Sequence, residues 1–108
     1  DGGRDVIASP DALGLESPRI VVEVKHRKGA MGAPAIRSFI GGLRTNDRGL
    51  YVSTGGFTRE ARYEADRSNV PMRLLDLDGF VRHYVDVYDK TDEETRDILP
   101  LTRIWWPA

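Results

Sequence analysis

The chain has 108 residues, which is the length of one domain, and its 40% hydrophobic and 31% charged residues are typical of a folded globular protein. It contains no cysteine, which excludes a disulfide scaffold, thiolate-bound zinc and cysteine catalysis, and its two histidines speak against a histidine-based metal site. No apolar run approaches the roughly 20 residues that a membrane-spanning helix needs.

The net charge of −1 hides a strong segregation of charge along the chain. Residues 19–44 carry six basic side chains against one acid, and residues 76–97 carry eight acids against three bases. A basic block in a nearly neutral protein either attracts a polyanion or forms a solvated surface, and charge alone leaves both interpretations open.

The first half of the chain predicts two strands, a loop and a helix. Residues 4–8 favour a short strand, and two prolines and a glycine in residues 9–18 indicate a loop. The β-branched residues of 19–26 predict the clearest strand. Apolar side chains then recur every three to four residues and predict a helix over about 33–44.

The second half predicts strands alternating with helices. The two strands are expected at 49–54 and 72–76, and the two helices at 59–68 and 77–88. A short helix that ends before Pro100 and an extended segment over Leu101–Trp106 complete the chain. The order β-β-α-β-α-β-α-α predicts an α/β fold in which helices flank both faces of a mixed β-sheet.

The predicted strand 19–26 carries an unusual pair of charges. Glu23 and Lys25 are two residues apart, so both side chains project from the same face of the strand. On an edge strand they would form a solvated pair. On a central strand they would need partners or a metal, because burying such charges is costly.

Asp5 lies on the preceding predicted strand, so the fold can bring its carboxylate near that of Glu23. Two carboxylates, a backbone carbonyl and waters form a hard-oxygen site suited to Mg²⁺, which polarises a phosphodiester and activates water. Lys25 beside this site would position the water or stabilise negative charge in the transition state. Asp11, in the predicted loop, is a rival for the first carboxylate, and Asp5 is preferred because it lies on a strand.

Five segments together resemble the catalytic domain of Mrr-type restriction endonucleases, a branch of the PD-(D/E)xK nuclease superfamily. The Glu-x-Lys triplet alone is a weak signal, whereas the ordered set with matching spacing is a strong one. The segments are Asp1–Asp5, Val21–His26, Ala35–Leu43, Gly49–Thr58 and Leu74–Gly79.

The resemblance implies roles for individual residues. Asp5 and Glu23 match the metal ligands, with the backbone carbonyl of Val24 as a third, and Lys25 matches the catalytic lysine. It implies a Mg²⁺-dependent endonuclease, with Mn²⁺ as a substitute, that hydrolyses phosphodiester bonds of double-stranded DNA. Contacts to DNA are expected from Lys28, Arg37, Arg44 and Thr54.

The resemblance also implies how the domain is organised, and two other functions remain as alternatives. Residues 1–108 are expected to form a single nuclease domain, the C-terminal part of a longer cytoplasmic protein, without its N-terminal helix and without membrane contact. The domain is also expected to be able to form a homodimer. The alternatives are a structure-specific nuclease such as a junction resolvase and a catalytically silent module that only binds DNA.

Overall fold

A four-stranded β-sheet forms the centre of the computed structural model. The structure describes residues 6–98, and at Thr95 and Ile98 it describes the backbone alone. The strand order is β1 (Val6–Ala8), β2 (Arg19–Lys25), β3 (Asp47–Ser53) and β4 (Met72–Leu75). β1 pairs antiparallel with β2, and the other two pairs are parallel. The sheet is therefore mixed, as predicted.

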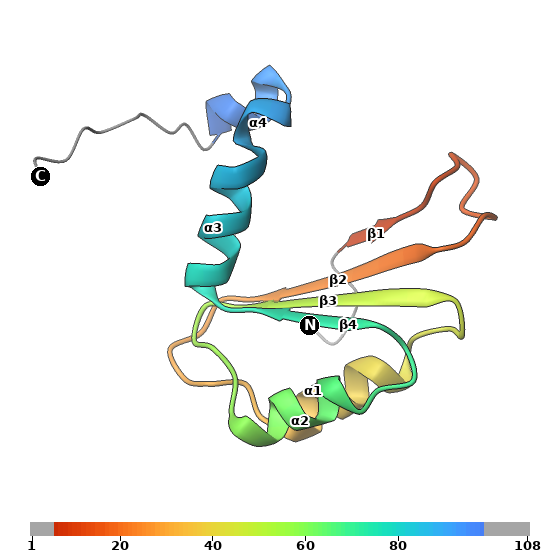
Figure 1. Cartoon of the computed structure of the whole chain (residues 1–108), viewed down its shortest axis with the longest axis vertical. Coiled ribbons are helices and arrows are strands. Elements are labelled where there is room, and N and C mark those ends of the chain that lie inside the picture. Colours follow the sequence, from red (N-terminus) through yellow and green to blue (C-terminus); the bar gives the residue numbers. More distant parts are fainter. Residues whose placement is uncertain (1–5, 99–108) are drawn as a thin grey trace, which may run out of the picture.

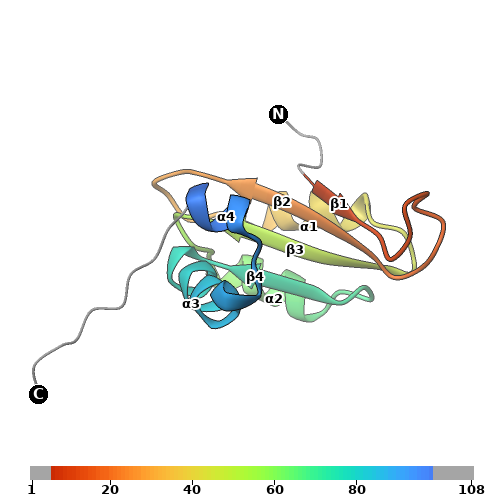
Figure 2. The same ribbon diagram turned by 90° about the horizontal axis from the view of Figure 1, so that it is seen from above.

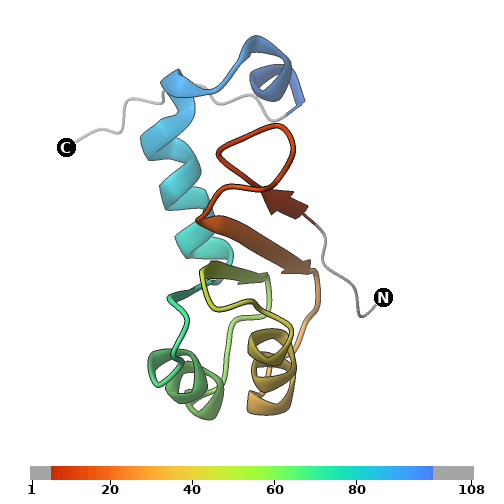
Figure 3. The same ribbon diagram turned by 90° about the vertical axis from the view of Figure 1, so that its right-hand side faces the viewer.

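Helices lie on both faces of this sheet, which confirms the predicted architecture (Figures 1 and 3). α1 (Ala33–Gly41) and α2 (Arg59–Asp66) lie side by side on one face. α3 (Leu77–Val87) rises from the opposite face and leads through the short 3₁₀ helix η1 (Tyr88–Lys90) into α4 (Glu93–Ile98). Between residues 6 and 98, no helix has the length and apolar character needed to cross a bilayer.

The element boundaries differ from the predictions at a few ends. The helix predicted to reach residue 44 ends at Gly41, where two consecutive glycines lower helix propensity. β3 begins two residues earlier than predicted, because Asp47 pairs with Arg19 in the parallel ladder. Residues 4 and 5 of the first predicted strand, and the extended segment predicted over 101–106, lie outside the described residues.

β2 is an interior strand, because it lies between β1 and β3 (Figure 2). The alternative that β2 lies at the edge of the sheet is therefore wrong, although its described pairing with β1 covers only Ile20–Val22, and Glu23 and Lys25 pair with β3 alone among the described residues. The antiparallel register places Val6 opposite Val22, and the parallel register places Lys25 opposite Ser53. These registers decide which side chains are neighbours at the carboxyl end of β2.

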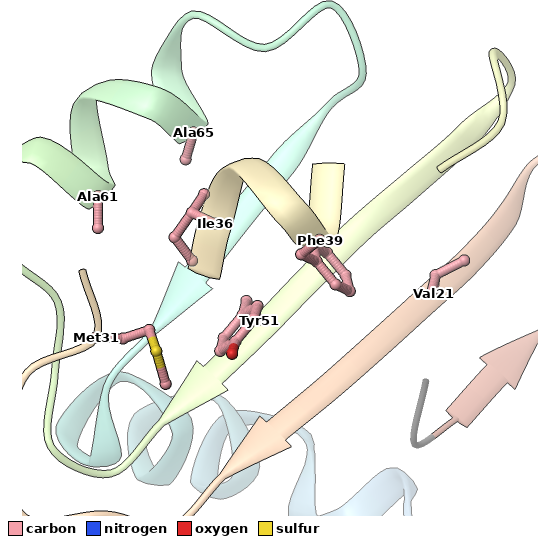
Figure 4. Packing of buried hydrophobic residues seen from close by; sticks show 7 residues of the cluster. All are labelled: Val21, Met31, Ile36, Phe39, Tyr51, Ala61 and Ala65. Carbon is pink, nitrogen blue, oxygen red and sulfur yellow. The ribbon is translucent and has the colours of Figure 1, made fainter. Parts of the chain in front are cut away.

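The main core fills the space between the sheet and the helix pair α1–α2 (Figure 4). Ile36 and Phe39 are buried on α1, and Ile40 and Leu43 are partly buried beside them. Gly49 of β3 faces this helix, and a Cβ atom there would lie 2.9 Å from the Phe39 ring of α1 and 2.3 Å from the Met72 sulfur of β4. The absence of a side chain at Gly49 thus permits the close packing of α1 on β3. The other members of the buried cluster are Val21, Met31, Tyr51, Ala61 and Ala65.

Replacing Phe39 by alanine is expected to lower the free energy of unfolding by about 3–5 kcal/mol, because the lost ring leaves a cavity. The Phe39 side chain is 8% exposed, and its ring meets that of Tyr51 edge-on with a centroid distance of 5.2 Å. Urea denaturation measures the loss. The neighbouring Ser38 is exposed on the same helix, so Ser38→Ala is the matched control. A loss below about 1 kcal/mol for Phe39→Ala would show that α1 does not anchor the core.

A two-pronged ion pair joins the starts of β2 and β3. Arg19 donates to both carboxylate oxygens of Asp47, with Nε···Oδ1 and Nη2···Oδ2 distances of 2.9 and 2.7 Å. The backbone N–H of Arg44 donates to the same carboxylate at 2.8 Å. The hydrogen bonds from Arg19 are the main cause that lowers the pKa of the Asp47 carboxyl below its ordinary value. The Arg44 bond acts in the same direction.

This pair predicts a pH-dependent contribution to stability. A carboxyl whose pKa is lower in the folded than in the unfolded state stabilises the fold above the unfolded pKa of about 3.9, and the stabilisation is lost as the pH falls through the folded pKa. The difference in unfolding free energy between wild type and Asp47→Asn should therefore shrink between neutral pH and about pH 3. Urea denaturation at both pH values tests this, with Asp66→Asn at the exposed end of α2 as control. A difference that is independent of pH would contradict the prediction.

Candidate active site

Glu23 and Lys25 lie on the face of β2 that is shared with Val21, the strand's fully buried residue in the core below α1 and α2. The strand carries both side chains past the covered core to its carboxyl end, where both are half-buried. The alternation predicted from the sequence is confirmed, since Val24 between them is exposed on the opposite face. The interior position and the shared face bring a carboxylate and an ammonium group to one place.

The donor chemistry at Glu23 fits a hard cation such as Mg²⁺. No described residue donates a hydrogen bond to the Glu23 carboxylate or forms an ion pair with it, and a carboxylate with a neighbouring backbone carbonyl supplies the oxygen ligands that this ion prefers. Among the described residues, no three His, Cys, Asp or Glu side chains lie close enough together to hold a metal ion.

The second expected ligand, Asp5, lies outside the described residues. The described pairing of β1 with β2 ends at Val6 opposite Val22. In the sequence, Asp5 is the neighbour of Val6 and Glu23 is the neighbour of Val22.

The rival carboxylate of Asp11 has a structural role in the loop between β1 and β2. Its two oxygens accept hydrogen bonds from the backbone N–H groups of Leu15 and Glu16, each at 2.9 Å. These two bonds lower the pKa of the Asp11 carboxyl. The loop geometry therefore accounts for Asp11 without a metal.

Thr54 ties together the loops that follow β2 and β3. Its hydroxyl accepts a hydrogen bond from the Arg27 backbone N–H at 2.9 Å and lies 3.2 Å from the Arg27 carbonyl. The neighbouring Gly55 has no room for a side chain, because a Cβ atom would lie 2.2 Å from the Gly29 carbonyl oxygen. The chain directly after Lys25 is thus held in place by the chain directly after β3.

The four side chains expected to contact DNA are spread along the domain. Lys28 is exposed in the loop after β2 and lies, with Thr54, at the same end of the sheet as Lys25. Arg37 is 54% exposed on α1 and forms an ion pair with Glu64 of α2 at 3.1 Å. Arg44 lies at the opposite end of β2, where its backbone contacts Asp47. The structure thus brings Lys28 and Thr54 to the carboxyl end of β2, places Arg44 at its amino end and carries Arg37 on α1.

Ser53 is a polar residue whose environment the sequence did not reveal. It is the last residue of β3, lies opposite Lys25 and is fully buried. Its position at the end of a predicted strand was visible in the sequence, but the parallel register that makes it a neighbour of Lys25 was not.

Comparison with known proteins identifies the family. Residues 1–84 match the family model of the Mrr catalytic domain, described as a restriction endonuclease. A type IV methyl-directed restriction enzyme of Escherichia coli (strain K12), EcoKMrr, is 39% identical over 64 residues, which are 57% of this chain and 20% of that protein. The chain thus spans about a fifth of the length of this curated relative.

A solved structure shows the same fold. The MspJI restriction endonuclease, determined in complex with a 27-mer oligonucleotide, has a TM-score of 0.62 to this chain at 23% identity. The match covers 94% of this chain and 25% of that one. The predicted restriction-endonuclease-like architecture is therefore confirmed, and the chain belongs to the Mrr-type restriction endonuclease catalytic domain family.

Proposed function

We propose that this domain is a Mg²⁺-dependent endonuclease of the restriction type that hydrolyses phosphodiester bonds of double-stranded DNA in the cytoplasm. The observation that carries the proposal is the pair Glu23 and Lys25 on one face of an interior strand, in a member of a restriction endonuclease family. Both side chains are half-buried beside an apolar core, which is a costly place for charged groups, and a catalytic role would account for this pair.

In this proposal Asp5, Glu23 and the backbone carbonyl of Val24 hold the Mg²⁺, and Mn²⁺ can substitute. When bound, the ion supplies Lewis-acid polarisation of the scissile phosphate and lowers the pKa of a bound water. Lys25 orients the attacking water or donates hydrogen bonds to the phosphate oxygen on which negative charge develops. Glu23 also fixes the electrostatic environment of the lysine, because the two side chains share a face.

The DNA would contact Lys28 and Thr54 beside the reacting centre and Arg37 and Arg44 further along. The seven residues of β2 span about 20 Å, which corresponds to about six base pairs of B-DNA. Such contacts to phosphates hold the duplex in place without reading its sequence. A homodimer would present one such site to each DNA strand.

The test is cleavage of a supercoiled plasmid by the whole natural polypeptide, with Mg²⁺, Mn²⁺, Ca²⁺ or a chelator. The expected result is nicked and linear product with Mg²⁺ or Mn²⁺ and none with the chelator. DNA binding without cleavage in every metal would favour a silent binding module. Cleavage restricted to a synthetic four-way junction would favour a structure-specific nuclease.

A further inference from the structure

Among the side chains that the structure describes, Ser53 carries the one buried polar atom without a hydrogen-bond partner. The residue is 0% exposed at the carboxyl end of β3. A buried hydroxyl without a partner costs free energy, and an alanine would fill almost the same space without that cost. Packing alone therefore does not explain why the position holds a serine.

Lys25 is the cross-strand neighbour whose ammonium group could use the hydroxyl. The two residues are direct partners in the parallel ladder, and side chains that are paired in this way project from the same face, with the strands about 4.8 Å apart. On the other side, the pairing of β3 with β4 ends one residue earlier, at Val52 opposite Leu75. Lys25 is thus the cross-strand neighbour of Ser53 on the face that also carries Glu23.

We propose that Ser53 is a positioning residue for Lys25, a role that rests on the function proposed above. Its hydroxyl oxygen accepts a hydrogen bond from the Lys25 ammonium group, directly or through one water, when DNA and metal occupy the site. Lys25 makes another interaction in this structure, and an ammonium group has three donors, so this bond adds to the existing one. The second anchor restricts the lysine to the orientation in which it meets the water or the phosphate.

The test compares Ser53→Ala and Ser53→Thr with the exposed-helix control Ser38→Ala. Single-turnover cleavage at saturating DNA should slow about tenfold in Ser53→Ala and recover to within about threefold of wild type in Ser53→Thr, which restores the hydroxyl. The affinity for DNA in the presence of Ca²⁺ should stay within about twofold of the wild-type value, and so should the affinity for Mn²⁺. The unfolding temperature of Ser53→Ala should equal or exceed that of wild type, because the substitution removes a polar atom without a partner.

Two results would overturn the proposal. One is a wild-type cleavage rate in Ser53→Ala. The other is slow cleavage in both Ser53 variants together with a lowered unfolding temperature, which would show that the residue acts through packing.

A second measurement separates this proposal from the proposed function. In the complex with DNA and Ca²⁺, the NMR signal of the Lys25 ammonium group should shift in Ser53→Ala and not in Ser38→Ala. If the wild type binds DNA but never cuts it, this shift supports the contact while the nuclease function fails. An unchanged signal overturns the contact even in an active enzyme.

Discussion

Replacing Lys25 by alanine is expected to slow metal-dependent cleavage of a supercoiled plasmid by about 10²–10³-fold, the cost of removing one group that stabilises transition-state charge. Mn²⁺ affinity should remain close to that of wild type, because in the proposed mechanism the lysine acts on water and phosphate and is not a metal ligand. Calorimetry measures the metal affinity, and single-turnover kinetics measure the cleavage step.

The chain offers matched controls, because it has three lysines, Lys25, Lys28 and Lys90. Lys28 is exposed in the loop after β2, so Lys28→Ala should weaken DNA binding and its salt dependence while leaving the rate at saturating DNA unchanged. Lys90 is exposed in η1, within the acidic residues 76–97, and Lys90→Ala should change neither the DNA affinity nor the cleavage rate. If Lys25→Ala cut DNA at the wild-type rate, the proposed mechanism would be wrong.

The fold was largely predictable because its elements have strong local signals. The β-branched run of β2 is typical of a strand, and the apolar side chains of α1 recur with the period of a helix. Helices between successive strands predict parallel pairing, and β2, β3 and β4 are parallel. The errors lie at element ends, where Gly41 and Gly42 stop a helix and the Arg19–Asp47 pair extends a strand.

The candidate site was only partly predictable, because its neighbours are set by register and not by spacing along the chain. That Glu23 and Lys25 share a face follows from the two-residue period of a strand. That Ser53 lies beside Lys25, and that Thr54 holds the Arg27 backbone, depends on how β2 and β3 align. A shift of one residue would turn Ser53 to the other face of the sheet, so no local pattern specifies this contact.

The dispersal of the basic block has the same cause. The six basic residues of 19–44 are close in sequence, but α1 carries the chain back from the carboxyl end of β2 to the amino end of β3. Lys28 and Arg44 consequently lie at opposite ends of the sheet. Charge alone left open whether this block attracts a polyanion or forms a solvated surface, and the fold divides the block between the two ends of the sheet.

Replacing Asp5 by alanine is expected to reduce Mn²⁺ affinity by at least about 100-fold, because it removes one of the two charged ligands that we propose for a hard-ion site. Plasmid cleavage should be lost with it. Asp11→Ala is the control, because the two oxygens of Asp11 are already bound to the backbone N–H groups of Leu15 and Glu16. This variant should loosen the loop between β1 and β2 and leave metal affinity unchanged.

Metal-independent DNA binding separates a lost ligand from a lost fold in this comparison. Both variants should bind DNA in the presence of a chelator, with an affinity that falls steeply as salt rises, because the basic residues of 19–44 are intact. Calorimetric titration with Mn²⁺ then decides between the two carboxylates. If Asp11→Ala alone lost the metal, Asp11 would be the ligand, and the roles of Glu23 and Lys25 would stand with a different partner on the loop.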